Sequence, residues 1–171
     1  MEGTMKKIIT FIIFQIIVFG SSVHFIEKME HTGIQQVRIA DRIEQKNPQL
    51  ECLAKNIFYE SGSESYEGKL AVATVTMNRV AHRSFPRTVC AVVYQRGKRG
   101  CQFSWTCGGK SHFNIQLYNE SFKVAQQVLL KHKRLYTIKN SVYFHNTSIH
   151  PNWDFAVPIK QIGNHIFYTM K

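Results

Sequence analysis

Acidic side chains are scarce in this sequence. Its 171 residues include 11 Asp and Glu against 22 Lys and Arg. From residue 51 onward the only carboxylates are Glu51, Glu60, Glu64, Glu67, Glu120 and Asp154. A mechanism that depends on a pair of carboxylates therefore has very few candidate pairs, and any catalytic acid comes from a short list.

Zinc-binding sequence motifs are missing as well. No CxxC pair occurs, and the histidines of the tail, His145, His150 and His165, form neither an HxxxH nor a His-x-Glu motif. Structural and catalytic zinc sites usually draw on such closely spaced ligands. We therefore expect neither a metal nor another cofactor.

A long apolar segment is also lacking. The apolar run over 8–19 follows two lysines and precedes the small residues 20–22, which is the layout of a secretory signal. The run is shorter than the roughly 20 residues that span a bilayer, although residues 23–26 would extend it. We expect 1–26 to be either a signal peptide or an N-terminal membrane anchor, so that the rest of the chain works outside the cytoplasm.

Export gives the cysteines a consistent meaning. The chain contains Cys52, Cys90, Cys101 and Cys107, and an even number of cysteines in an oxidising compartment predicts disulfides. Two bridges are expected, and the sequence leaves the three possible pairings open. A zinc site built on the same cysteines is the lesser alternative.

The charge indicates an anionic partner. The formal net charge is +11, and a strongly basic protein is suited to a polyanion or an anionic surface. Nucleic acid, anionic lipid and bacterial wall polymers all fit this description. The densest basic run, 131–134, is interpreted as the solvated end of a helix, where positive charge complements the helix dipole.

The spacing of apolar residues predicts several helices in a domain over 50–171, which follows a polar linker over 27–49. Leu50, Leu53, Ala54, Ile57 and Phe58 have the spacing of an amphipathic helix, and turn formers stop it at 61–63. Further helices are expected over 66–82, with Ser65 as N-cap, over 88–94 and over 120–132.

The second half of the domain contains segments that favour strands. Residues 142–145 and 162–169 are rich in aromatic and β-branched side chains, and Pro151 and Pro158 mark a loop between them. A turn is expected over 96–100 and an extended piece over 101–105. The fold class predicted is therefore a helix-dominated α+β domain with a small antiparallel sheet.

Glu60 is the strongest candidate for a catalytic acid. It lies on the last turn of the first predicted helix, directly after the apolar residues Ile57, Phe58 and Tyr59. Apolar neighbours disfavour the charged form of a carboxyl, so its pKa rises toward the value that a general acid needs near neutral pH. On spacing alone, an ordinary surface glutamate at a helix end is the favoured interpretation.

Several motifs together resemble a known family. The segment ECLAKNIFYESGSESYEGKLAVATVTMNRVAHRSFPRTVCAVVYQ is followed by RGCQFSWTCGG, SVYFHN, PNW and IGNHIFY. In this order, over about residues 50–169, they resemble the cell wall hydrolase family typified by the SleB and CwlJ spore-cortex-lytic enzymes. The version with cysteines looks like the Gram-negative or phage-borne branch.

The resemblance implies a lysozyme-like fold and assigns the residues of the site. Glu60 occupies the place of the catalytic glutamate in the pattern aromatic-E-x-x-G-E, and Glu64 matches the second acidic position. Candidates for substrate binding fall within the shared motifs: Glu64, Gln102, Ser104, Tyr143, His145, Asn164 and Tyr168. Trp105 and Trp153 are interpreted as core or rim packing.

The resemblance also implies a reaction on peptidoglycan. The bond cleaved is the β-1,4 linkage between N-acetylmuramic acid and N-acetylglucosamine. With one carboxyl we favour an anhydro-forming lytic transglycosylase over hydrolysis, because hydrolysis usually needs a second carboxylate. A zinc-dependent amidase and a non-enzymatic basic wall-binding protein are the alternatives. The expected protein is a monomer that binds no nucleic acid and acts in the periplasm or on the periplasmic face of the inner membrane.

Overall fold

The computed structural model describes the following residues: 3, 19–20, 22–23, 26, 28–31, 33–36, 38, 46–97, 100–108 and 112–171. The chain divides into two units, Met1–Lys46 and Asn47–Lys171, and each is considered by itself. Most of the expected signal or anchor segment over 1–26 lies outside the described residues. The described residues of 28–38 are helical, and no helix among the described residues has the length and hydropathy to cross a bilayer.

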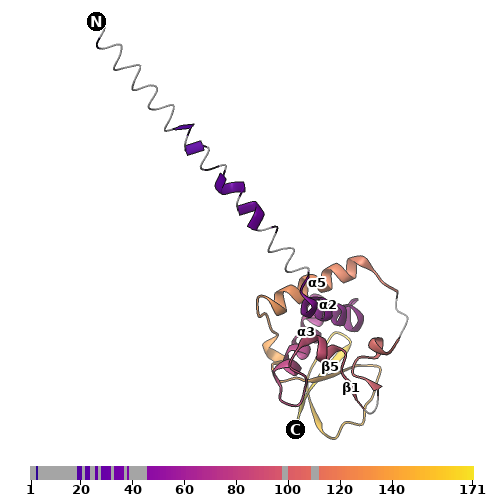
Figure 1. The fold of residues 1–171 in the computed structure, drawn as a ribbon. Helices are drawn as coiled ribbons and strands as arrows, with labels where there is room; N and C mark the ends of the chain where they lie inside the picture. The colour runs from indigo at the N-terminus through magenta and orange to yellow at the C-terminus, as the bar shows by residue number, and fades with distance from the viewer. Residues whose placement is uncertain are drawn as a thin grey trace. The chain divides into compact units, whose positions relative to one another are not determined.

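The second unit contains all the remaining elements (Figure 1). In chain order they are α2 (Pro48–Ser61), α3 (Tyr66–Ala81), α4 (Val89–Val93), β1 (Arg96–Gly97), β2 (Gly100–Cys101), η1 (Ser104–Cys107), α5 (Ile115–Leu129), η2 (Tyr136–Ile138), β3 (Tyr143–Asn146), β4 (Ala156–Ile162) and β5 (His165–Met170). The predicted helix-dominated α+β domain is confirmed.

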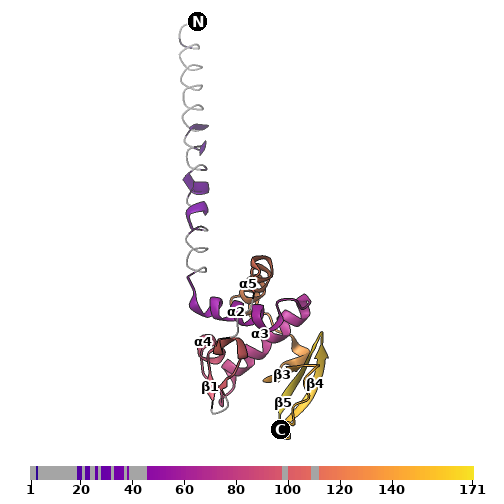
Figure 2. The ribbon, with the colours of Figure 1, turned by 90° about the vertical axis from the view of Figure 1, so that its right-hand side faces the viewer.

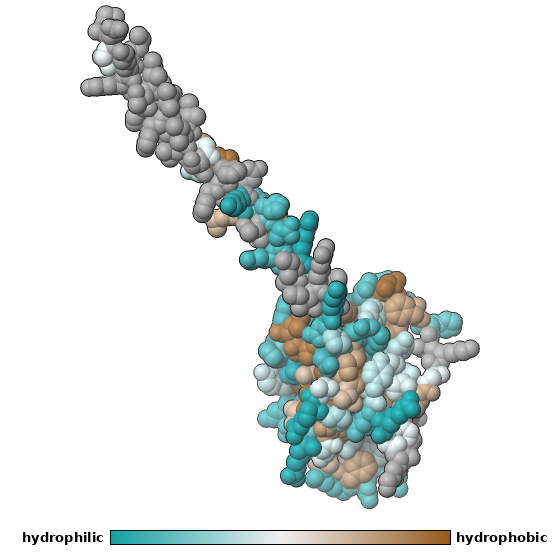
Figure 3. Space-filling model, viewed as in Figure 1, coloured by the Kyte–Doolittle hydropathy of each residue, from teal (hydrophilic) through white to brown (hydrophobic). Residues whose placement is uncertain are grey.

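Helix α3 connects the two hydrophobic clusters of this unit. Its Leu70 and Ala73 pack with residues of α2, α4 and α5, whereas its Ala71, Val72 and Val75 pack with the sheet. Figure 2 shows α3 between α2 and the three-stranded sheet. The outer surface seen in Figure 3 mixes hydrophobic with hydrophilic residues, as expected once the large apolar side chains are inside.

Local side-chain caps explain where the first helices begin. Asn47 accepts hydrogen bonds from the backbone of Gln49 and Leu50 at the start of α2. The predicted N-cap Ser65 accepts from the Gly68 amide at 3.3 Å. Such caps satisfy amides that have no partner within the helix.

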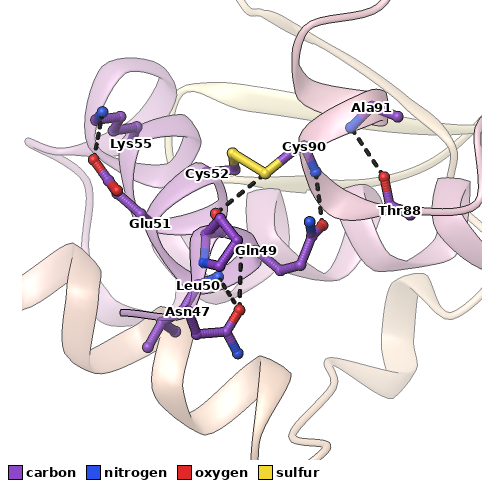
Figure 4. Close-up of a disulfide and its surroundings, with 10 residues drawn as sticks. Asn47, Gln49, Leu50, Glu51, Cys52, Lys55, Thr88, Cys90 and Ala91 are labelled. Atoms are coloured by element: carbon purple, nitrogen blue, oxygen red, sulfur yellow. Dashed lines mark hydrogen bonds and ion pairs between the residues drawn. A yellow bond between two sulfur atoms is a disulfide. The ribbon is translucent and has the colours of Figure 1, made fainter. Parts of the chain in front are cut away.

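The disulfides join Cys52 to Cys90 and Cys101 to Cys107. Two bridges were expected, and the structure selects one of the three pairings. The first bridge ties α2 to α4, where the Cys90 amide also donates to Gln49 Oε1 at 3.0 Å (Figure 4). The second bridge closes a short loop between β2 and η1.

The segment that contains this second bridge differs from its predicted structure. Residues 101–105 were expected to be extended, but Ser104–Cys107 forms a 3-10 helix. Six extended residues would cover about 20 Å, whereas the Cα atoms of Cys101 and Cys107 are 5.8 Å apart. The chain therefore has to turn within the loop.

The boundaries of α5 were also predicted incorrectly. The helix was expected over 120–132, yet it begins at Ile115 and ends at Leu129. Asn114 caps its start by accepting from the Leu117 amide at 3.1 Å, and His132 has a positive φ of 54° that no helix continues through. Within this helix Ala125 is fully buried.

The sheet contains a strand that was assigned to a loop. Strands β3, β5 and β4 lie in that order and are antiparallel. The predicted strand over 162–169 is β5 together with the end of β4, separated by the turn residues Gly163 and Asn164. Pro158 lies inside β4 next to an irregularity in the register. Proline is tolerated there because β4 is an edge strand.

Candidate functional site

Glu60 lies where α2 ends. The neighbouring residues Ile57 and Phe58 are buried, and the Gly62 amide closes the helix by donating to Phe58 O at 3.0 Å. The Glu60 side chain is half-buried and makes no hydrogen bond or ion pair with any described residue. Burial raises the pKa of its carboxyl to about 7, and the positive charge of Arg79 opposes this rise. The carboxyl can therefore exist in either protonation state near neutral pH.

Arg79 is a member of the site that the sequence did not single out. It is only 2% exposed, at the last turn of α3. Its Nε donates to Val142 O at 2.7 Å, and no carboxylate of the described residues lies within ion-pair distance. Burial lowers the pKa of Arg79 to about 10, while the charges of Tyr143 and Glu60 raise it. At neutral pH it is therefore a buried cation.

Aromatic rings surround the Arg79 guanidinium. Its central carbon lies 5.2 Å from the ring centroid of Phe103, 5.4 Å from that of Phe85 and 5.8 Å from that of Tyr143. Rings within about 6 Å attract a cation through their electron-rich faces. The arrangement keeps a positive charge inside the fold near the carboxyl of Glu60.

Gln102, like Tyr143, is a predicted site residue that contacts Arg79. With the amide oriented so that both groups are satisfied, its oxygen accepts from Nη1 and Nη2 at 3.2 and 3.3 Å. The Gln102 side chain is otherwise exposed. Ser104, also exposed, begins the 3-10 helix, and no hydrogen bond or ring contact links it to another predicted site residue within the described part of the chain.

Glu64 has a different environment from Glu60. Its Oε1 accepts from Nδ2 of Asn164 at 2.9 Å, and it lies 4.0 Å from Nδ1 of His165. The predicted residues Glu64 and Asn164 are thus brought together, at the β4–β5 turn. Burial lowers the pKa of His165, an effect larger than the opposing one of Glu64.

The remaining predicted residues lie on one face of the sheet. Tyr143 and Tyr168 face each other in the β3–β5 register, and His145 Nε2 lies 2.7 Å from Tyr168 Oη. The ring of Trp153 lies 5.8, 5.4 and 5.4 Å from those of Tyr143, His145 and Tyr168. We call Tyr143, His145, Trp153 and Tyr168 the aromatic face. All four are half-buried, so each is partly accessible to solvent.

Both tryptophans are half-buried and pack against other aromatic rings. Trp105 stacks on Tyr59 with centroids 4.5 Å apart, and its Nε1 donates to Asn56 Oδ1 at 3.3 Å. Trp153 belongs to the aromatic face.

Most other carboxylates of this unit already have partners. Glu51 pairs with Lys55 at 2.6 Å, Glu120 with Lys69 at 2.9 Å, and Glu67 with Lys160 at 3.8 Å. Asp154 is exposed. Glu60 therefore differs from these carboxylates in being sheltered and yet without a partner among the described residues.

No three His, Cys, Asp or Glu side chains of the described residues gather closely enough to hold a metal ion. All four cysteines are used in the two disulfides. Of the tail histidines, His145 contacts Tyr168 and Asn146, whereas His165 lies beside Glu64.

The fold and site define an α+β domain with one sheltered acid at a helix end. A family model described as Cell Wall Hydrolase matches residues 63–168. The spore cortex-lytic enzymes of Bacillus cereus and Bacillus subtilis are 32% and 29% identical over 120 and 125 residues. The chain belongs to the cell wall hydrolase family, and the expected family membership is confirmed.

These alignments cover 69% and 71% of this chain but 43% and 37% of the two relatives. The chain thus spans less than half the length of the curated relatives that it matches. Glu60 lies three positions before the first residue matched by the family model, so its role remains a prediction.

Two solved structures share the fold. The catalytic domain of the germination-specific lytic transglycosylase SleB from Bacillus anthracis superposes with a TM-score of 0.54 at 25% identity, over 72% of this chain and 96% of that domain. The catalytic domain of the Bacillus cereus SleB protein gives 0.51 at 26% identity, over 71% and 89%. The lysozyme-like fold expected from the resemblance is confirmed by these neighbours.

Proposed function

We propose that this protein cleaves the glycan strand of peptidoglycan between N-acetylmuramic acid and N-acetylglucosamine as a lytic transglycosylase, with Glu60 as its single catalytic acid and base. The observation that carries this proposal is the state of Glu60. Its carboxyl is half-buried, lacks a hydrogen-bond or ion-pair partner among the described residues, and has a pKa raised to about 7. A group with these properties can give up a proton and later take one back.

The proposed reaction runs in two proton transfers. Protonated Glu60 first donates its proton to the glycosidic oxygen, and the C1–O bond breaks. The Glu60 carboxylate then accepts the proton of the muramoyl 6-hydroxyl while the hydroxyl oxygen attacks C1. A 1,6-anhydro ring forms, water is not consumed, and Glu60 returns to its protonated state. Neither a metal nor a cofactor takes part.

The surroundings of Glu64 favour this route over hydrolysis. A hydrolytic glycosidase usually uses a second carboxylate to activate water or to attack the sugar. Glu64, the nearest acidic residue in sequence, is bonded to Asn164 and only 11% exposed at its side chain. We infer that Glu64 holds the loop after α2 in place and leaves the chemistry to Glu60.

The aromatic face and Gln102 are proposed to bind the glycan. Partly exposed rings provide apolar surface for the faces of sugars, and their hydroxyl and imidazole groups provide hydrogen bonds. Tyr143 connects this face to the catalytic group, because it contacts Arg79, whose charge acts on Glu60. Ser104 and Asn164 stay candidates from the sequence.

The proposed setting is the bacterial cell wall. We propose that residues 1–26 serve as signal peptide or anchor, that 27–49 form a linker and that 50–171 act catalytically as a monomer. The protein would work in the periplasm or on the periplasmic side of the inner membrane, without nucleic acid. Its net charge of +11 suits an anionic wall.

The experiment that tests the proposal digests purified sacculi with the oxidised protein and analyses the products by mass spectrometry. Wild type should release anhydro-muropeptides, lighter by one water than hydrolysis products. Glu60→Gln should bind sacculi and release nothing. Glu67→Gln is the matched control, because Glu67 is an exposed carboxylate paired with Lys160. Cleavage by Glu60→Gln, or cut peptide stems on an intact glycan, would contradict the proposal.

A further inference from the structure

Arg79 is an unusual residue to find inside this fold. A buried charge is normally paired with an opposite charge, because burial of an unpaired ion is costly. Arg79 is 2% exposed, yet its guanidinium contacts a carbonyl, an amide and three aromatic rings instead of a carboxylate. Packing alone would be served by an apolar side chain of similar length.

The chemistry of the guanidinium fixes the direction of the Gln102 amide. An arginine side chain offers only donors, so the group that Gln102 presents to Nη1 and Nη2 is its oxygen, at 3.2 and 3.3 Å. The NH2 group of the same amide is then directed away from Arg79. Gln102 is exposed, so this NH2 group is available as a donor at the surface.

The segment that carries Gln102 is held at several points. The backbone N–H of Gln102 donates to the backbone carbonyl oxygen of Gln95 at 2.9 Å. Its neighbour Phe103 is 3% exposed and packs against Arg79, and the disulfide Cys101–Cys107 closes the loop. The side chain of Gln102 thus extends from a fixed backbone toward a fixed cation.

We propose that Arg79 is a positioning residue that turns the Gln102 NH2 group outward as a hydrogen-bond donor for the carbonyl of a sugar N-acetyl group. This inference rests on the proposed function and adds to it the substrate group that is recognised. An NH2 group fixed in this direction can only donate, so it selects sugars that present a carbonyl oxygen as acceptor. It discriminates against sugars with a free amine, because an ammonium at that position is itself a donor.

The test compares N-acetylated sacculi with sacculi whose glycan has been chemically de-N-acetylated. Wild type should cleave the acetylated glycan with a KM about tenfold lower, a ratio typical of one lost hydrogen bond to a buried or oriented group. Gln102→Glu keeps an acceptor beside Arg79 but has no NH2 group. It should lose this discrimination through a higher KM on the acetylated substrate, with kcat changed less than about twofold.

Arg79 variants separate positioning from folding. Arg79→Lys keeps the charge but loses the forked donors, so it should show the same loss of discrimination as Gln102→Glu. Arg79→Met removes the charge as well, and should in addition shift the alkaline limb of the pH profile to higher pH, because the cation that opposes protonation of Glu60 is gone. If Arg79 had a merely structural role, its variants would have a lower melting temperature but an unchanged acetyl discrimination and an unchanged pH profile.

The outcomes distinguish this inference from the proposed function. If wild type does not cleave glycan, the proposed function itself fails. If wild type cleaves and Gln102→Glu still prefers the acetylated glycan by the wild-type ratio, the function stands and the assignment of Gln102 and Arg79 is overturned.

Discussion

Oε1 of Glu64 accepts a hydrogen bond from Nδ2 of Asn164 at 2.9 Å across 100 residues of sequence. This bond connects the loop that follows Glu60 with the β4–β5 turn. The buried Lys69 supports the same loop, since its Nζ donates to Glu64 O at 3.0 Å. The loop next to the proposed catalytic acid is therefore held by a contact with the β4–β5 turn.

Gly163→Ala should break this connection. Gly163 has a φ of 55°, and a Cβ placed there would overlap Oε2 of Glu64. Backbone strain at such a position costs about 1–3 kcal/mol, and the displaced carboxylate should reduce glycan cleavage as well. Gly97→Ala is the control, because a Cβ at Gly97 meets nothing within 4 Å. Equal melting temperatures for the two variants, measured by calorimetry, would contradict this prediction.

Glu60→Gln should stabilise the protein at alkaline pH while abolishing activity. The folded-state pKa of Glu60 is raised from 4.5 to about 7, so the folded protein holds a proton that the unfolded chain has lost between these values. The stability that this group contributes is complete below pH 4.5 and is lost as pH rises to about 7.

A raised pKa of this size corresponds to at most about 3 kcal/mol. Denaturant unfolding at pH 4 and pH 8 measures the effect. Glu60→Gln should match wild type at pH 4 and exceed it at pH 8, whereas Glu67→Gln should show no such gain. A stability difference that does not change with pH would show that the carboxyl of Glu60 is not sheltered.

The features predictable from the sequence are those with local signals. The apolar spacing and the Ser65 cap were sufficient for α2 and α3, and aromatic and β-branched residues were sufficient for β3 and β5. Glu60 became a candidate because its apolar neighbours precede it directly in the chain and because it occupies the glutamate position of the family pattern, and its catalytic role stays a prediction. The fold class follows from the same local patterns.

The missed features depend on segments that are distant in sequence. In the sequence, nothing distinguishes Arg79 from the other basic residues, because a buried arginine has no local signature. Its contacts with Phe103 and Tyr143 form only in the folded protein. Strand β4 was assigned to a loop because of Pro158, since edge position is a property of the whole sheet. The start of α5 was missed although Asn114 offered a capping signal.

Tyr168→Phe should weaken glycan binding through His145. Nδ1 of His145 lies 2.8 Å from the Asn146 carbonyl oxygen, which can only accept, so the proton of the neutral ring is on Nδ1. Nε2 then accepts from the Tyr168 hydroxyl at 2.7 Å. Loss of that hydroxyl frees the ring, and KM should rise about 2- to 10-fold.

Nitrogen NMR of His145 checks the tautomer, which should be Nδ1-protonated in the neutral form. Tyr136→Phe is the matched control, since Tyr136 is 81% exposed and its side chain makes no ring contact or hydrogen bond with the aromatic face among the described residues. If both variants leave KM unchanged, Tyr168 has no role in orienting a substrate-binding group.

Removal of the two disulfides should affect different properties: the longer bridge mainly stability, and the shorter bridge mainly activity. Cys52–Cys90 spans 38 residues and Cys101–Cys107 spans 6, and loop-closure entropy predicts contributions of about 4 and about 2 kcal/mol to stability. The longer bridge joins α2 to α4 (Figure 4), whereas the shorter one encloses Gln102, Phe103 and Trp105.

Cys52→Ala/Cys90→Ala should therefore lower the melting temperature more, and Cys101→Ala/Cys107→Ala should lower kcat/KM on sacculi more. The shorter loop carries Phe103 and Gln102, which both contact Arg79. A small displacement of this loop would therefore remove Gln102 from the substrate. A pair of variants in which activity merely follows stability would show that the Cys101–Cys107 bridge has no specific part in shaping the site.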